Sequence, residues 1–239
     1  MIQLVLKIRK QLPRVGGKKL YWMLKPEIEK LEENMGRDKF FDLLRRNKLL
    51  VKRKKSFVRT TNSFHRFHKH RNLIKDLRMT GPNKVYASDI TYMRIKGRFI
   101  YLALITDMYS RKIVGWDLSD SLAVEGAVRA LKMALGQCPD PSGLIHHSDR
   151  GFQYCSHVYT NILKTNKTKI SMTEENHCYE NSLAERVNGI LKDEFLLDQE
   201  FNNERIAYKA VKQAIKNYNG LRPHLSLQNF TPDTVHQAA

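Results

Sequence analysis

Three acidic side chains stand at positions from which they could share metal ions. Asp89 lies in VYASDITYMRI, which alternates as a β-strand does, and Asp149 follows the short apolar segment LIHHS. Glu185 lies in a helical pattern, and 35 residues separate it from Asp149. Carboxylates on a strand, a strand end and a helix can converge on two hydrated Mg2+ ions, the arrangement that in-line phosphoryl transfer uses. These three acids are therefore the candidate catalytic and metal-binding residues.

Each acid also has a simpler interpretation. Asp89 could accept hydrogen bonds from a turn, although a carboxylate within an apolar sheet is costly unless it is paired or metal-bound. Asp149 could close an Asx-type turn, with Gly151 allowing the loop to turn sharply. Glu185 could complete a capping box with Ser182 and only satisfy backbone donors at the start of a helix.

The helix that carries Glu185 offers further polar groups. If this helix begins before Ser182, then Glu185, Asn188 and Lys192 share one of its faces. A carboxylate, an amide and a cation in this order suit a phosphodiester substrate beside a metal ion.

The positive charge of the chain is concentrated at its N-terminus. The chain has a formal net charge of +18, of which residues 1–80 contribute +16, with 23 Lys or Arg against 7 Asp or Glu. Such a distribution predicts a polyanionic partner, nucleic acid first, although a solvated surface explains scattered charges. Eight basic residues lie between positions 45 and 59, and the candidate DNA contacts among them are Arg45, Arg46, Lys52, Arg53, Lys54 and Lys55.

Residues 1–50 have the pattern of short helices joined by tight turns. Apolar residues recur at helical spacing in 3–12, 18–24 and 37–49, with breaks at Pro13 and Gly16 and a bend or restart expected at Pro26. The last segment has Arg45 and Arg46 opposite its apolar face. A helix-turn-helix unit that reads a DNA groove and a small helical bundle with a soluble face explain this pattern equally well.

The pattern changes to strands after residue 81. Three strands are expected in 85–95, 99–107 and 111–118, then a helix in 123–135, a strand ending at Asp149 and a final helix in about 204–218. This order predicts an α/β domain with a mixed sheet. No apolar run could span a bilayer, so no membrane association is expected. The three cysteines show no CxxC spacing, which favours a reducing cytoplasm.

These segments together resemble a known family. The chain is similar to the DDE transposases of the insertion sequence three family, specifically their integrase-like second-frame product. The resemblance covers about residues 81–239 and rests on DITYM, FIYLALITDMYSRKIVGW, HSDRGFQY, AERVNGILKDEF and the tail YNGLRPHLSL. Two positions depart from the family pattern: Tyr86 stands where Trp is frequent, and Glu180 where Asp is frequent.

The resemblance implies an RNase H-like fold, a mixed five-stranded sheet flanked by helices. Asp89, Asp149 and Glu185 would bind two Mg2+ ions, with Mn2+ as a substitute. Lys192 and Asn188 would contact DNA near the scissile phosphate. Arg150 belongs to the motif around Asp149, where loop shaping and DNA contact are both open.

The resemblance further implies an enzyme that cleaves DNA at the ends of an insertion sequence and transfers the strand. The expected divisions are a helical DNA-binding unit (1–50), a basic linker (51–80), a catalytic core (81–200) and a C-terminal helix and tail that complete it (201–239). Expected partners are element-end and target DNA, further copies of the chain on paired ends, and an upstream helix-turn-helix frame product. The location would be the bacterial cytoplasm, in association with the nucleoid.

Two rival functions remain open at this point. An RNase H-like nuclease would hydrolyse DNA without joining it. A catalytically silent DNA-binding product of a truncated element would need only the basic N-terminal residues.

Overall fold

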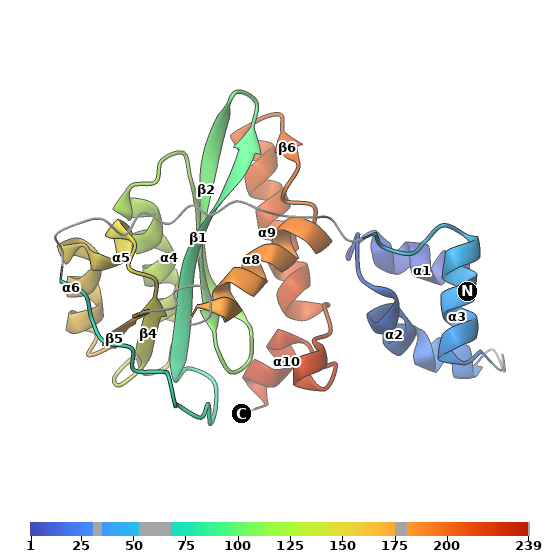
Figure 1. Cartoon of the computed structure of the whole chain (residues 1–239), viewed down its shortest axis with the longest axis horizontal. Helices are drawn as coiled ribbons and strands as arrows, with labels where there is room; N and C mark the ends of the chain where they lie inside the picture. The colour runs from blue at the N-terminus through green and yellow to red at the C-terminus, as the bar shows by residue number, and fades with distance from the viewer. Residues whose placement is uncertain (31–34, 53–67, 175–180, 239) are drawn as a thin grey trace.

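A mixed β-sheet forms the centre of the molecule (Figure 1). The computed structural model describes residues 1–30, 35–52, 68–174 and 181–238. The sheet order is β3-β2-β1-β4-β5, and a short sixth strand, β6 (Glu200–Phe201), pairs with β1. The predicted α/β class and mixed sheet are confirmed, with β6 as an addition to the five predicted strands. The five strands are β1 (Val85–Ile95), β2 (Arg98–Asp107), β3 (Ile113–Ser119), β4 (Ile145–Ser148) and β5 (Lys169–Met172).

The register of the central strands decides where the acidic residues lie. β1 and β2 are antiparallel, and a two-residue turn with Gly97 in the left-handed region (φ 77°) joins them. β4 runs parallel to β1 and pairs Ser148 with Ser88. Since Asp89 and Asp149 each follow one of these paired serines, the register brings them to neighbouring positions at the carboxyl end of β4.

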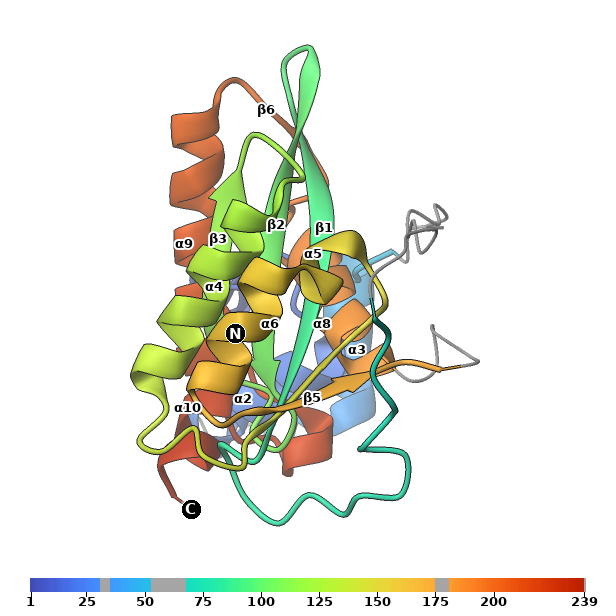
Figure 2. The same cartoon turned by 90° about the vertical axis from the view of Figure 1, so that its left-hand side faces the viewer.

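Helices cover both faces of the sheet (Figures 1 and 2). Leu131, Tyr159 and Leu163 belong to the apolar cluster on one face, and Val187, Leu191 and Val211 to the cluster on the other. The first face is covered by α4 (Val124–Gln137), α5 (Phe152–Cys155) and α6 (His157–Thr165), and the second by α8 (Ser182–Glu194) and α9 (Glu204–Gly220).

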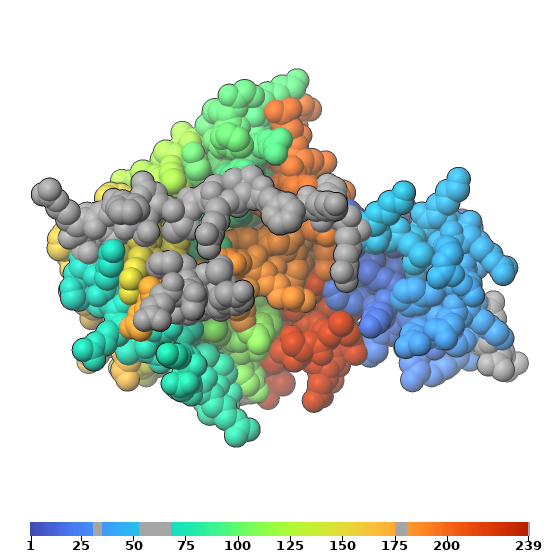
Figure 3. Space-filling model, viewed as in Figure 1, coloured from blue at the N-terminus to red at the C-terminus, as the bar shows by residue number. Residues whose placement is uncertain are grey.

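Three N-terminal helices form a lobe beside the sheet domain, coloured blue in Figure 3. They are α1 (Ile2–Arg9), α2 (Gly17–Lys30) and α3 (Arg37–Arg46). Leu20, Phe40 and Leu44 are fully buried between them, and their cluster continues into the one beneath α8 and α9. Of the bend or restart expected at Pro26, the restart is wrong, because Pro26 lies inside the continuous helix α2. Proline forfeits one hydrogen bond there, and packing of Leu24 and Ile28 on either side holds the helix together.

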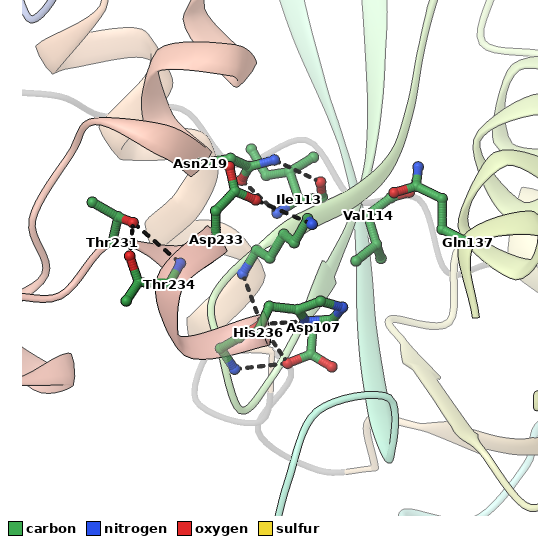
Figure 4. A network of polar contacts seen from close by, with 11 residues as sticks. Asp107, Ile113, Val114, Gln137, Asn219, Thr231, Asp233, Thr234 and His236 are labelled. Carbon is green, nitrogen blue, oxygen red and sulfur yellow. Dashed lines mark hydrogen bonds and ion pairs between the residues drawn. The ribbon is translucent and has the colours of Figure 1, made fainter. Parts of the chain in front are cut away.

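The C-terminal segment returns to the sheet after α9. A 3-10 turn, η1 (Leu225–Leu227), leads to α10 (Pro232–Gln237). Figure 4 shows α10 beside the turn between β2 and β3, where Lys112 and Asp233 form an ion pair of 3.1 Å and Ser110 Oγ hydrogen bonds His236 Nδ1 (2.9 Å). The tail is thereby fastened to the sheet domain.

Asp107 anchors the same turn from inside. Its carboxylate is fully buried and accepts hydrogen bonds from the backbone N–H groups of Asn83 (2.7 Å), Tyr109 (3.1 Å) and Ser110 (2.7 Å). Such a carboxylate, saturated by backbone donors, serves the turn rather than a substrate.

No helix among residues 1–30, 35–52, 68–174 and 181–238 is long and apolar enough to cross a membrane. Cys138 and Cys155 are buried free thiols. Cys178 lies outside the described residues.

Candidate active site

Asp89 lies in the middle of β1, half-buried and opposite Leu104 of β2. Its Oδ1 accepts a hydrogen bond from the N–H of Ile90 (2.9 Å), and its Oδ2 accepts one from Asn188 Nδ2 (2.7 Å). Asn188 belongs to α8, so one carboxylate joins the central strand to the helix that carries Glu185.

Asp149 occupies the loop that follows β4. Its Oδ1 accepts a hydrogen bond from the Gly151 N–H (2.9 Å), which is the Asx-type turn that the sequence allowed. Gly151 is not needed for its dihedral angles, since φ is −63°. It is needed for space, because a Cβ atom there would lie 2.9 Å from Asp149 Oδ1 and 3.3 Å from Gln153 Oε1.

Glu185 stands in the first turn of α8, where the positive end of the helix dipole favours a carboxylate. The described part of this helix begins at Ser182 with Asn181 as its N-cap residue, so the capping box with Ser182 as the cap is not the arrangement formed. Asn181 Nδ2 donates to the carbonyl of Ser88 (3.1 Å), and Asn188 donates to Asp89 two turns later. The two amides fix α8 along β1 on either side of Glu185.

The pKa of Asp89 depends on burial and on its acidic neighbours. Burial, and then the negative charge of Asp149, raise the pKa of Asp89 to about 7. The hydrogen bonds from Asn188 and the Ile90 N–H oppose this rise, and the charge of Glu185 adds to it. The three sequence-predicted acids therefore share one electrostatic neighbourhood, although 35 residues separate the last two in the chain.

Within the described parts of the chain, no three His, Cys, Asp or Glu side chains form a group that could hold a metal ion. Asp149 and Glu185 are near enough to act on Asp89 but are not arranged with it as a ligand set. In chemistry the three residues fit a divalent ion, because carboxylate oxygens are the donors that hard cations prefer. Burial raises the pKa of Asp89 most, and the negative charges of Asp149 and Glu185 add to the rise.

Lys192 lies one turn beyond Asn188 on the same side of α8. Its Nζ is 4.1 Å from the centre of the Tyr92 ring, a cation–π contact. Burial lowers the pKa of Lys192, and the charges of Asp89 and Asp198 act against this. A cation thus stands in the field of Asp89, as the expected order of carboxylate, amide and cation required.

The remaining predicted DNA contacts are dispersed. Arg45 and Arg46 are exposed in the last turn of α3, where Arg45 pairs with Asp42, and Lys52 is exposed beyond that helix. Arg150 is half-buried beside Asp149. Asn188 is buried with its donor engaged by Asp89. Arg53, Lys54 and Lys55 lie outside the described residues.

A second anchor of α8 was missed from the sequence. Glu194, at the C-terminal end of this helix, accepts two hydrogen bonds from Arg222, one from Nε (2.8 Å) and one from Nη2 (2.6 Å), and one from Lys19 (3.0 Å). Arg222 is 5% exposed and also donates to His224 Nε2 (2.9 Å). The tail motif containing Arg222, Pro223 and His224 therefore supports α8 at its C-terminal end, and Lys19 brings the N-terminal lobe to the same point.

Comparison with known proteins agrees with the predicted fold and family. Residues 79–178 match one family model described as an integrase core domain, and residues 166–232 match a second of that description. The 31 kDa protein of insertion element IS600 from Shigella sonnei is 34% identical over 242 residues, 98% of this chain and 89% of that protein. The transposase InsF of insertion sequence IS3A from Escherichia coli K12 is 34% identical over 192 residues, 80% of this chain and 67% of that one.

Solved structures share the fold at lower identity. The HTLV-2 integrase catalytic core domain in complex with magnesium superposes with a TM-score of 0.53 and 21% identity, covering 66% of this chain and 99% of that one. The simian T-cell lymphotropic virus intasome, in complex with a PP2A regulatory subunit, superposes with a TM-score of 0.56 and 17% identity, covering 95% and 72%.

The sheet order is that of RNase H-like integrase cores. The integrase core match and the transposase relatives define the chain as a polynucleotidyl transferase of the DDE type. More narrowly, the chain belongs to the insertion sequence three (IS3) family of transposases. The predicted family, fold and enzyme class are thereby confirmed, and no finding favours the plain nuclease or the silent DNA-binding protein.

Proposed function

We propose that Asp89, Asp149 and Glu185 bind divalent metal, two Mg2+ ions that Mn2+ can replace, and that this site cleaves and joins DNA at the ends of an insertion sequence. The observation that carries the proposal is the position of Asp89, which the pairing of β1 with β4 places beside Asp149 and which Asn188 ties to the helix of Glu185. Burial and the charges of the other two acids raise the pKa of Asp89 to about 7. Groups whose pKa values are shifted by burial and like charges mark functional sites. When bound, divalent metal neutralises this charge, makes water a stronger nucleophile and stabilises the leaving oxygen.

The chain's own residues hold and orient the reactants. Asn188 fixes the carboxylate of Asp89, and Asn181 fixes α8 against β1. The helix that carries Glu185 is therefore held along the strand that carries Asp89. Lys192 would bind a phosphate oxygen beside Asp89, since its charge lies in the field of that acid.

Two phosphoryl transfers follow from such a site. In the first, the oxygen of water attacks phosphorus and the bond to the 3′ oxygen breaks, which leaves a 3′ hydroxyl at the element end. In the second, that hydroxyl attacks a phosphodiester of the target, and the displaced oxygen takes up a proton. No serine or tyrosine of the protein needs to form a covalent intermediate.

We further propose that residues 1–50 bind DNA through a helix-turn-helix-like lobe, with residues 51–80 as a basic linker. The support is the net charge of +16 over residues 1–80 and the exposure of Arg45, Arg46 and Lys52. Copies of the chain would act together on paired element ends, assisted by an upstream helix-turn-helix frame product, on the nucleoid of a bacterial cytoplasm. An insertion sequence has two ends to cut, which favours an assembly with more than one active site.

Strand transfer by purified protein tests the active site. A labelled duplex from the end of the element is incubated with Mg2+, using the wild type, Glu185→Gln and the control Glu125→Gln. Glu125 is also exposed in the first turn of its helix, α4, so the control removes a comparable charge away from Asp89. Joined product is expected from the wild type and the control only. Equal product from Glu185→Gln would remove Glu185 from the site, and nicking without joining by the wild type would contradict the transfer step.

A further inference from the structure

The hairpin formed by β1 and β2 carries an uncovered aromatic face on the side of the strands opposite Asp89. β4 pairs with only the first four residues of β1, and the residues of β2 paired with β3 begin at Tyr101. The tip of the hairpin therefore extends beyond β3 and β4 and pairs there with β6. In Figures 1 and 2 it rises above the helices that cover the rest of the sheet.

The two faces of this tip differ in their surroundings. Met93, Ile95 and Ile100 point to one face and are buried in the cluster that includes β6, α8 and α9. The register pairs Arg94 with Phe99 and Tyr92 with Tyr101, so these four side chains point to the other face. Phe99 is 51% exposed, Arg94 is exposed, and both tyrosines are half-buried.

The rings on the open face are arranged in contact with one another and with a cation. Phe99 meets Tyr92 edge to face, with ring centres 5.3 Å apart and an interplanar angle of 82°. Lys192 reaches the same ring from α8, 4.1 Å from its centre. The positive charge of Arg94 lowers the pKa of Lys192, so the two cations lie near each other at the border of the aromatic face.

Exposed rings bordered by cations are the means by which proteins hold single-stranded nucleic acid. Bases stack on the rings, and phosphates bind the basic groups. A paired duplex cannot use such a face, because its bases are already stacked. Asp89 itself points to the opposite face of β1, with Met93 and Ile95. Lys192 connects this aromatic face to the proposed catalytic centre, because its Nζ contacts the Tyr92 ring and its helix contacts Asp89 through Asn188.

We propose that Tyr92, Phe99, Arg94 and Lys192 form a binding site for an unpaired nucleotide of the DNA strand adjacent to the scissile phosphate. This site deepens the proposed function and rests on it, since it assumes that the acids beside it act on DNA. Tyr92 has two tasks in it, because its ring both holds Lys192 in place and offers a surface to a base.

Binding by the full chain to two DNAs tests the site. One is a fully paired duplex of the element end, and the other has the same sequence with its last two nucleotides unpaired, both in buffer without divalent metal. Phe99→Ala should weaken binding to the unpaired DNA by about 5- to 100-fold, the range for one base stacked on an aromatic ring, and binding to the paired DNA by less than about twofold. Phe230→Ala is the matched control, because Phe230 is 48% exposed on the C-terminal tail.

Tyr92 gives a second, graded test. Tyr92→Phe keeps a ring beneath Lys192 and should bind the unpaired DNA like the wild type, whereas Tyr92→Leu should lose the same preference as Phe99→Ala. If the variants weaken both DNAs equally, or neither, the site is refuted while the cleavage assay still stands. If the wild type binds neither DNA and cleaves nothing, the proposed function fails instead.

A photochemical measurement locates the base without any variant. Replacing an unpaired thymine by 5-iodouracil and irradiating the complex should crosslink the DNA to position 92, 99 or 101. Crosslinks confined to the N-terminal lobe or the C-terminal tail would overturn the assignment.

Discussion

Replacing Asp89 by Asn should stabilise the folded protein at alkaline pH while abolishing catalysis. The pKa of Asp89 is about 7 in the folded protein and 3.8 in an unconstrained chain. Since the folded state binds this proton more tightly, ionised Asp89 opposes folding fully above pH 7, and the opposition fades as the pH falls through 7 towards 3.8. Asp89→Asn removes the charge and retains the shape.

The magnitude follows from the shift. A difference of about 3 pKa units at 1.36 kcal/mol per unit gives about 4 kcal/mol at pH 8 and less than about 2 kcal/mol at pH 5. Replacing the charged acceptor by an amide weakens the hydrogen bond from Asn188, and this loss lowers the gain in stability by about 1–2 kcal/mol. Asn188 can compensate by turning its amide, because its Oδ1 is buried without a hydrogen-bond partner in the described structure. We expect a net gain of about 2–3 kcal/mol at pH 8 and little change at pH 5.

Urea unfolding without divalent metal measures the free energy of unfolding of the wild type and of Asp89→Asn. The fluorescence of Trp22 and Trp116 is the signal. Asp76→Asn is the control, since Asp76 is exposed and its replacement should change stability by less than about 0.5 kcal/mol at either pH. Millimolar Mg2+ should stabilise the wild type at pH 8 and have a smaller effect on Asp89→Asn. An Asp89→Asn protein that is no more stable than the wild type at pH 8 would refute the argument that uncompensated charge gathers at this site.

Three further predictions concern the contact that holds α8, the loop of Asp149 and the basic residues expected to bind DNA. Arg222→Ala should lower the free energy of unfolding by about 3 kcal/mol, because it removes both Arg222 hydrogen bonds from the mostly buried Glu194 and leaves it with Lys19. A loss below about 1 kcal/mol in urea titration would show an ordinary surface pair. Gly151→Ala should slow cleavage by about 10- to 100-fold at unchanged DNA affinity, since the new Cβ displaces the Asp149 carboxylate, and wild-type rates would disprove the close approach. Alanine at all four basic positions in 52–55 should weaken binding to every DNA sequence and flatten the dependence of log affinity on log salt by up to about 3.6, and an unchanged slope would make this run mere solvated surface.

The acids could be found from the sequence because their signals are local. Asp89 stands out as a charge in an alternating strand, Asp149 as a polar residue where an apolar run stops, and Glu185 as a member of a helical face. Periodicity gave the strands and helices around them. The pairing of Ser148 with Ser88 brings Asp149 beside Asp89. The two serines are 60 positions apart, and no local sequence pattern predicts which residues of two such strands pair.

The supports were missed for the same reason. The sequence places Arg222 in the tail motif but gives it no partner. Only the fold shows that its guanidinium group is buried against Glu194. Tyr92 reads as a strand residue that should pack, and only the length of the hairpin beyond β3 and β4 leaves its face open. A weak signal existed for Glu194, since an acid in the last turn opposes the helix dipole and so calls for a cationic partner.

The contacts of α8 explain why the N-terminal lobe and the tail meet at one helix. Its first half holds Glu185 between the two amides that bond to β1, and its last residue receives cations from the lobe and from the tail. Arg14 of the lobe adds an ion pair with Asp193 at 2.7 Å. Because a helix is stiff along its axis, a displacement at Glu194 moves Glu185 relative to Asp89. The N-terminal lobe, through Lys19, and the tail, through Arg222, therefore help to set the position of Glu185 beside Asp89.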